Sequence, residues 1–286
     1  MEKNWLVIDL INWAESYFKE KGIENPRGEI EWILCSVLNC GKLEVYLRFE
    51  EPLSSNQLNK LRSFVKRRLK NEPLQHITGS CSFYGRKYFV NKHVFIPRPE
   101  TERLIDIALD KMNNIQNPLI IDVGTGTGCI AITLAIEIKD SNVTGIDISK
   151  DAMNNAKYNL EHFNRKNVFF HELDFLNEIK IDKADLLISN PPYITLNEYN
   201  SLDKQIRDFE PSIALTDRKD GLIFYKRFAE LAQSLVKPSG WMILEVGAGG
   251  HPKKVESIFR DHGFCNIEII NDYNGDNRVI AINNHL

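Results

Sequence analysis

The spacing of apolar residues divides the chain into a helical part and a part in which strands and helices alternate. Apolar side chains recur at near-helical intervals from residue 5 to residue 18, and Gly22 follows as a stop. Asn25 and Pro26 then supply a cap and a first-turn proline for a second helix, which we expect to run through residues 30–38 and to end near Gly41. A third helix is expected from residue 54 or 55 to about residue 70. Residues 1–72 therefore predict a small helical domain.

Residues 73–98 show a different pattern, made of short β-like pieces. Phe83-Tyr84 and Tyr88-Phe89-Val90 are too short for helices, and Gly79 and Gly85 interrupt the segment. We interpret residues 73–98 as a β-hairpin linker between two domains.

Residues 99–286 alternate apolar strands with amphipathic helices. After a helix at about 100–112, strands are expected near 119–123, 142–147, 167–171, 185–189 and 241–246, and helices near 128–138, 149–163, 220–236 and 252–262. Such alternation predicts a parallel sheet with helices on both faces. Two further β-like runs, 264–271 and 278–284, are joined by a turn too short for a helical crossover. The predicted fold is therefore α/β, a Rossmann-like seven-stranded sheet whose last strand pair is antiparallel.

Composition and charge narrow the classes of function. The 286 residues are 43% hydrophobic and 26% charged, as in an ordinary globular protein, and no stretch approaches the roughly 18 apolar residues of a membrane span. The N-terminus lacks the pattern of a signal peptide, so we expect a cytoplasmic protein. A net charge of -3 predicts no stable nucleic-acid binding. The five cysteines are odd in number and lack CxxC spacing, which argues against a disulfide framework and a zinc site.

The glycine-rich stretch Gly124-Thr125-Gly126-Thr127-Gly128 directly follows the predicted strand 119–123. Glycines there allow a sharp turn and a close approach to a nucleoside-containing cofactor. The spacing is GxGxG, whereas dinucleotide sites use GxGxxG, so NAD fits less well. Asp147 ends the next strand, where a carboxylate can accept hydrogen bonds from ribose hydroxyls, and Phe175 follows the third strand, where it could cover an adenine ring. In this order the three elements resemble class I S-adenosylmethionine methyltransferases.

The tetrad Asn190-Pro191-Pro192-Tyr193 follows the predicted strand 185–189. Each proline fixes its own φ and restricts the preceding residue, so the loop should be stiff. The side-chain oxygen of Asn190 and the carbonyl of Pro191 suit an NH2 group, and Tyr193 offers a face for a planar amide or base. Two acceptors on the attacking nitrogen would stabilise the positive charge that develops during methyl transfer. We therefore predict Asn190, Pro191 and Tyr193 as catalytic, the whole tetrad as substrate-binding, and Asn190 as a contact to the cofactor too.

These motifs together resemble the HemK/PrmC family, methyltransferases that modify the glutamine side-chain amide in the Gly-Gly-Gln loop of peptide chain release factors. The resemblance covers nearly the whole chain and includes Pro-Leu-Gln-His-Ile-Thr-Gly at 73–79, Phe-Ile-Pro-Arg-Pro-Glu-Thr-Glu at 95–102, Phe-Glu-Pro at 209–211, Leu-Glu-Val-Gly at 244–247 and Asp-Tyr-Asn-Gly-Asp-Asn-Arg at 272–278. It implies that Gly124 to Gly128, Asp147 and Phe175 bind S-adenosylmethionine and that Asn190 to Tyr193 hold the glutamine amide. It also implies that the N-terminal helices help to dock the release factor. Residues 247–252 depart from the family's usual glutamine-containing version, and no role is carried over to them.

Two segments of the sequence each allow two interpretations of their role. Arg98, Glu100 and Thr101 either cap the next helix or form a loop that closes over the cofactor and the target amide. A basic cluster near the end of the third helix is either a solvated face or a docking site for an acidic or RNA-containing partner. Its members are Arg62, Lys66, Arg67, Arg68 and Lys70.

Three alternative functions remain beside glutamine methylation. Methylation of the exocyclic amino group of adenine or guanine uses the same planar NH2, and the tetrad does not separate the two. The absence of a basic field and of a large additional domain for reading DNA weighs against it. A scaffold that binds the cofactor without catalysis, and a nicotinamide dehydrogenase, fit the complete motifs less well.

Overall fold

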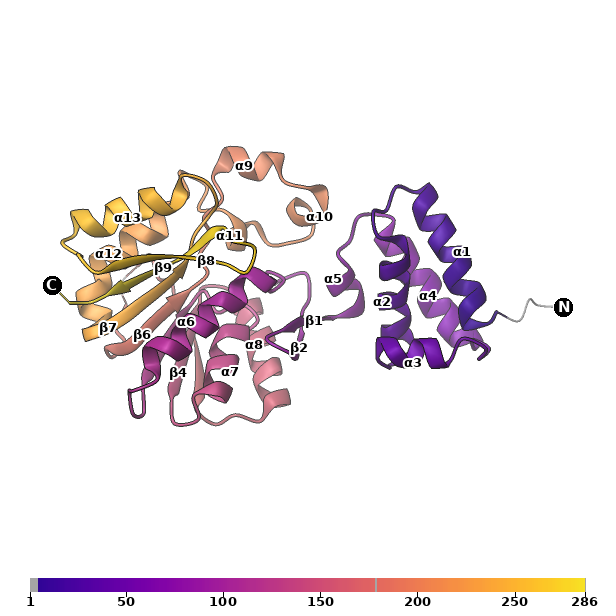
Figure 1. Ribbon diagram of the computed structural model, residues 1–286, viewed down its shortest axis with the longest axis horizontal. Helices are drawn as coiled ribbons and strands as arrows, with labels where there is room; N and C mark the ends of the chain where they lie inside the picture. Colours follow the sequence, from indigo (N-terminus) through magenta and orange to yellow (C-terminus); the bar gives the residue numbers. More distant parts are fainter. Residues whose placement is uncertain (1–4, 178, 286) are drawn as a thin grey trace. The chain divides into compact units, whose positions relative to one another are not determined.

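The computed structural model describes residues 5–177 and 179–285, and the chain divides into two compact units. The first unit ends at Gly79 and the second begins at Ser80, whereas the sequence placed the end of the helical domain at residue 72 (Figure 1). The segment expected as a hairpin linker is shared between them. Its first part is the short helix α5 (Leu74–Thr78), and its hairpin of β1 (Ser80–Phe83) and β2 (Arg86–Phe89) belongs to the second unit. Phe83 and Tyr88 are fully buried there, so the hairpin is part of a core.

The first unit consists of helices packed around one apolar core. The helices are α1 (Val7–Glu20), α2 (Pro26–Leu38), α3 (Lys42–Leu47), α4 (Ser55–Arg68) and α5. Asn25 caps α2 by accepting the N–H of Gly28, and Ser54 and Gln57 form a capping box on α4. The three longer helices confirm the sequence prediction. The helices α3 and α5 were not predicted, because five or six residues are too few to show a helical period.

Part of the basic cluster on α4 has structural partners. The Arg67 guanidinium pairs with Glu72 and also donates to the carbonyls of His76 and Ile77. The Arg68 guanidinium pairs with Glu29 on α2, and both side chains are largely buried. These two arginines therefore hold helices of the first unit together.

The second unit contains a seven-stranded sheet with the strand order β5-β4-β3-β6-β7-β9-β8 (Figure 1). The strands are β3 (Leu119–Val123), β4 (Asn142–Asp147), β5 (Val168–Glu172), β6 (Ala184–Ser189), β7 (Val236–Glu245), β8 (Ile267–Asn271) and β9 (Asn277–Asn283). The first five are parallel, and β9 runs antiparallel to both β7 and β8. The predicted α/β sheet with an antiparallel last pair is confirmed.

Two groups of helices cover the two faces of this sheet. The helices are α6 (Glu102–Met112), α7 (Cys129–Glu137) and α8 (Lys150–Phe163) on one face, and α12 (Ile223–Leu235) and α13 (His251–Asp261) on the other. The hairpin of β1 and β2 packs into the first of these two cores (Figure 1). A 3-10 turn, η1 (Pro99–Thr101), leads directly into α6, with Pro99 in its first position.

Between β6 and α12 the chain forms a segment that the sequence pattern did not predict. It contains three short helices, α9 (Leu196–Ser201), α10 (Lys204–Arg207) and α11 (Ser212–Leu215). An isolated bridge between Ile194 and Thr216 closes the segment at its base. None of the helices within the described residues is long and apolar enough to cross a membrane.

Candidate active site

A cavity of roughly 450 Å³ lies at the carboxyl edge of the parallel strands, a volume typical of small-molecule sites. Pairing aligns Val123 of β3 with Ile146 of β4 and Ser189 of β6, so the loops after these strands emerge side by side. The predicted residues that line the cavity are Gly124, Thr125, Gly126, Thr127, Asp147, Phe175, Asn190, Pro191, Pro192 and Tyr193. Segments at the ends of four strands, β3, β4, β5 and β6, therefore meet at one site, as expected for an open α/β sheet.

The glycine-rich loop presents two of its three glycines to the cavity. Gly124 and Gly126 have positive φ angles of 71° and 55°, and a Cβ at either would have no atom closer than 3.9 Å. Gly128 is different: it is buried, directly precedes α7, and does not line the cavity. Its φ is 78°, and a Cβ would lie 2.9 Å from the Phe170 ring. The structure therefore places Gly128 as a packing residue behind the loop.

Asp147 lies at the end of β4 with its carboxylate in the cavity. One carboxylate oxygen accepts the N–H of Gly126 at 3.0 Å and the other accepts the N–H of Ser149 at 2.9 Å. Burial raises the pKa of Asp147, and the two N–H groups oppose this shift. A carboxylate oxygen can accept more than one hydrogen bond, so both oxygens can also receive ligand hydroxyls.

The aromatic wall of the cavity is formed by Phe175. Its side chain is 4% exposed and packs on the Phe228 ring with a centroid distance of 4.5 Å. Two apolar side chains that the sequence reasoning missed, Ile148 and Leu176, line the cavity and are 46% and 39% exposed. Large apolar side chains left open to a cavity suit a flat apolar ligand group.

A second buried carboxyl supports the loop from behind. Asp122 on β3 accepts the hydroxyl of Thr125 at 2.6 Å and the N–H of Ala131 at 3.2 Å through the same oxygen. Its other oxygen is buried without a hydrogen-bond partner, and burial raises the pKa of Asp122 to about 7. Asp122 thus ties the start of the loop to the first turn of α7.

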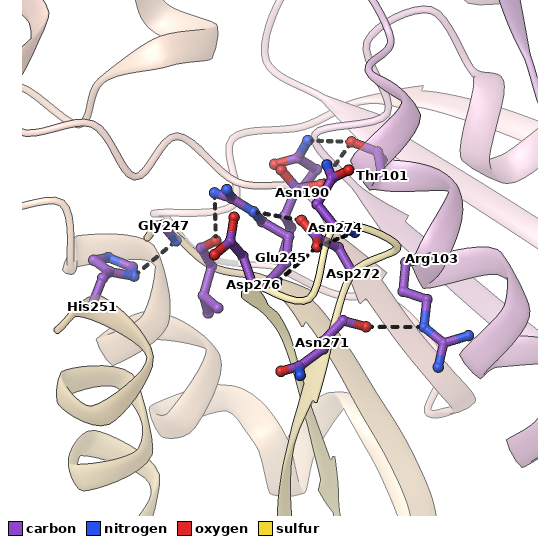
Figure 2. Close-up of polar contacts among 12 residues, drawn as sticks. Thr101, Arg103, Asn190, Glu245, Gly247, His251, Asn271, Asp272, Asn274 and Asp276 are labelled. Atoms are coloured by element: carbon purple, nitrogen blue, oxygen red, sulfur yellow. Dashed lines mark hydrogen bonds and ion pairs between the residues drawn. The ribbon is translucent and has the colours of Figure 1, made fainter. Parts of the chain in front are cut away.

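The tetrad is held by polar contacts from two distant elements. The Asn190 amide nitrogen donates to the Thr101 hydroxyl at 3.1 Å, and this hydroxyl donates to Glu245 at 2.7 Å, as Figure 2 shows. The Tyr193 hydroxyl donates to the other Glu245 oxygen at 3.2 Å. Burial raises the pKa of Glu245 to about 7, although the Thr101 and Tyr193 hydroxyls and the nearby Arg278 oppose the shift.

His251 fixes the far side of Tyr193. Its Nδ1 accepts the N–H of Gly247 at 3.1 Å, and its Nε2 lies 3.2 Å from the Gly221 carbonyl, which fits a neutral ring with the proton on Nε2 (Figure 2 shows the Gly247 contact). Burial lowers the pKa of His251. Its ring also contacts the rings of Tyr193 and Tyr225. The segment 247–252 therefore supports the site, and residue type alone did not indicate this.

Arg98 joins two walls of the cavity. Its guanidinium pairs with the buried Glu210 carboxylate and lies over the Phe95 ring at 4.7 Å. The same Glu210 carboxylate accepts the N–H of Ile96 at 3.0 Å. Since Phe95 and Pro211 both line the cavity, this contact fixes the loop before η1 against the segment that precedes α11. Within the described residues, no group of three or more His, Cys, Asp or Glu side chains is placed to hold a metal ion.

Comparison with known proteins matches both units. A family model described as the PrmC N-terminal domain matches residues 9–79, and one described as a methyltransferase domain matches residues 116–260. A release factor glutamine methyltransferase of Fusobacterium nucleatum subsp. nucleatum is 37% identical over 275 residues, which cover 96% of this chain and 77% of that protein. One of Geobacter sulfurreducens is 34% identical over 277 residues, covering 97% and 96% of the two chains. The chain belongs to the release factor glutamine methyltransferase family.

The fold of this family member also resembles that of solved methyltransferases. A methyltransferase structure from Pyrococcus furiosus matches with a TM-score of 0.53 and 15% identity, over 78% of this chain and 99% of that one. The likeness concerns the fold, and it agrees with the methyltransferase domain found by the family model.

Sequence reasoning on this glutamine methyltransferase family member named the loops of the site but missed their support. The sequence left Thr101 between a helix cap and a loop over the cofactor and the target amide, and it gave Glu245 no role. The available signal was position: Glu245 ends a buried strand at the edge where β4 ends in Asp147. A carboxylate that ends a buried strand at this edge is a candidate for the site.

Proposed function

We propose that this protein transfers a methyl group from S-adenosylmethionine to the side-chain amide nitrogen of the glutamine in the Gly-Gly-Gln motif of peptide chain release factors. The observation that supports the proposal best is the fixed amide of Asn190. The Asn190 amide nitrogen donates to the Thr101 hydroxyl, and no described residue donates to the amide oxygen. Asn190 lines the cavity. An acceptor held in place suits a substrate that presents an NH2 group.

The residues of the cavity fit the proposed cofactor. The open space beside Gly124 and Gly126 leaves room for a ligand against the loop backbone, and the Asp147 carboxylate has acceptor capacity for two ribose hydroxyls. Ile148, Phe175 and Leu176 supply apolar surface for the adenine ring. When bound, S-adenosylmethionine supplies an electrophilic methyl group on a sulfonium sulfur.

The tetrad then has to position the amide rather than to remove a proton first. The Asn190 oxygen and the Pro191 carbonyl would accept the two N–H groups, and the Tyr193 ring would lie against the amide plane. Positive charge would develop on the substrate nitrogen as it takes the methyl group from the cofactor sulfur, and these acceptors would stabilise that charge. The nitrogen then releases one proton to water. Tyr193 is not expected to act as a base, because burial and the neighbouring Glu245 raise its pKa.

We also propose that the first unit docks the release factor. Its surface carries five large hydrophobic side chains that are at least one third exposed, namely Trp13, Trp32, Leu43, Tyr46 and Leu47. Leu43 and Leu47 lie four residues apart on α3 and are 74% and 78% exposed, so they can be changed at little cost to folding. The double variant Leu43→Ser, Leu47→Ser should raise KM for the release factor and leave the affinity for S-adenosylmethionine unchanged. An unchanged KM would place docking elsewhere.

The experiment that tests the catalytic proposal offers the purified protein two kinds of substrate. Methyl-labelled S-adenosylmethionine is incubated with a purified release factor and, separately, with bulk nucleic acid, and the label is mapped by mass spectrometry. Label on the Gly-Gly-Gln glutamine is the expected result. Label on adenine or guanine alone would establish base methylation instead. Transfer to neither would contradict both activities.

A further inference from the structure

A chain of three hydrogen-bonding side chains connects the interior of the second unit to the tetrad. The Glu245 carboxylate accepts the Thr101 hydroxyl proton, and the Thr101 oxygen accepts an Asn190 amide proton (Figure 2). Thr101 is 3% exposed and Glu245 is 3% exposed, so water does not compete for these contacts. The three residues come from η1, the end of β7 and the loop after β6.

The direction of the hydrogen bonds determines which end of the Asn190 amide faces the substrate. A side-chain amide has two ends of similar shape, an oxygen that accepts and a nitrogen that donates. Because the ionised Glu245 carboxylate can only accept, the Thr101 proton points to it, and the Thr101 oxygen has only lone pairs left for Asn190. The amide nitrogen must therefore turn toward Thr101, and the amide oxygen is left for the cavity.

We propose that Thr101 and Glu245 are positioning residues that orient the Asn190 amide so that its oxygen accepts from the substrate nitrogen. The proposal rests on the function proposed above. If the amide turned over, its NH2 group would face the NH2 group of the substrate glutamine, and two donors would oppose each other. The attacking nitrogen would then lose the acceptor that holds it in line.

The carboxylate is itself fixed from several sides. Tyr193 donates to its second oxygen at 3.2 Å, and Tyr225 donates to the Glu245 backbone carbonyl at 2.6 Å. Glu245 also pairs with Val279 of β9, so a neighbouring strand holds its backbone. A residue held at both its backbone and its carboxylate gives Thr101 a single acceptor in a constant position.

The test replaces the hydroxyl and keeps the shape. Thr101→Val removes both hydrogen bonds, and Thr101→Ser retains the hydroxyl. Thr133→Val is the matched control, since Thr133 is fully buried on α7, contacts the Tyr88 hydroxyl at 2.8 Å, and does not line the cavity. For each protein we would measure kcat and KM for the release factor and the Kd for S-adenosylmethionine by calorimetry.

Thr101→Val should lower kcat by roughly 10- to 100-fold, the size expected for a misplaced reacting group, while the cofactor Kd changes little. Thr101→Ser should recover most of the turnover, and Thr133→Val should stay near the wild type. Wild-type kcat in Thr101→Val would overturn the proposal. An equal loss in Thr133→Val would also overturn it, because the effect would then come from any buried hydroxyl.

A second measurement separates this proposal from the proposed function. The Asn190 side-chain NH2 signals in a nitrogen-15 spectrum can be identified by their loss in Asn190→Ala. Hydrogen exchange of these protons should be slow in the wild type and faster in Thr101→Val, with no substrate present. Equal exchange rates would overturn the orientation by Thr101 even if the release factor is methylated. A wild type that shows slow exchange but no methylation would support the orientation and contradict the function.

Discussion

Gly124 and Gly128 lie four residues apart in one loop, yet an alanine should have a different effect at each position. At Gly128 the new methyl group would lie 2.9 Å from Phe170 and 3.2 Å from Ala156, in a residue with φ of 78°. The left-handed backbone costs about 1–2 kcal/mol for a residue with a Cβ, and overpacking costs about 1–3 kcal/mol more. Gly128→Ala should therefore destabilise the second unit by about 2–5 kcal/mol.

For a unit of about 200 residues this corresponds to a fall in Tm of roughly 4–20 °C. Gly124→Ala has the same backbone strain, with φ of 71°, but its methyl group meets no atom within 4 Å. Its Tm should fall by only roughly 2–8 °C. The methyl group would instead enter the cavity, and we expect S-adenosylmethionine to bind about tenfold or more weakly, equivalent to about 1.4 kcal/mol.

Thermal unfolding followed by circular dichroism measures the first effect, and calorimetric titration with S-adenosylmethionine measures the second. Both variants are titrated at a temperature at which they are folded. A Gly128→Ala protein that melts within about 1 °C of the wild type would refute the packing argument. A Gly124→Ala protein with unchanged cofactor affinity would remove this glycine from the cofactor site.

Three further predictions follow from the site. Asn190→Ala should lower kcat by roughly 100-fold and weaken cofactor binding far less, and labelled-methyl transfer at saturating cofactor would show whether turnover survives. Asp147→Ala should weaken the binding of S-adenosylmethionine by roughly 10- to 100-fold, because the hydrogen bonds from the two ribose hydroxyls to the carboxylate are lost. An unchanged calorimetric Kd would contradict this. Burial raises the pKa of Asp122 and Glu245 to about 7, so both carboxyls keep a proton in the folded chain at pH values where the unfolded chain has lost it. The free energy of unfolding should therefore fall as pH rises from about 4 to about 7, by about 1.4 kcal/mol per pH unit for each carboxyl. In Asp122→Asn this dependence should be shallower in urea titrations at pH 5, 6 and 7, and a slope equal to that of the wild type would contradict the assignment.

The strands were predictable from the sequence because a buried parallel strand is a short apolar run between helices. The runs at 119–123 and 142–147 match β3 and β4 residue for residue. The start of β7 was missed by five residues, because Pro238 and Gly240 interrupt the apolar pattern before Trp241 and the pairing with β6 shifts there. The helices α9 to α11 are only four to six residues long, which is too short to show a helical period in the sequence.

The loops of the candidate site were also predictable, since each follows a strand directly. The residues that hold these loops in place were not predictable, because they act through contacts between positions far apart in the chain. Thr101 and Glu245 are separated by 144 residues, and Arg98 and Glu210 by 112. A single sequence states which residues are present but not which of them pair, and only the folded sheet brings these groups together.

The hydrogen bonds that join Asn190, Thr101 and Glu245 also set the order in which the site can form during synthesis. Glu245 is added about 100 residues after Asp147, which is roughly 5–20 s at ordinary rates of translation. The strand β9, which pairs with the segment that carries Glu245, is made later still. A growing chain therefore contains the glycine-rich loop and the tetrad before it contains the carboxylate that orients the Asn190 amide. In a product truncated before β7, no carboxylate would fix the Thr101 proton, and the Asn190 amide could face the cavity with either its oxygen or its nitrogen.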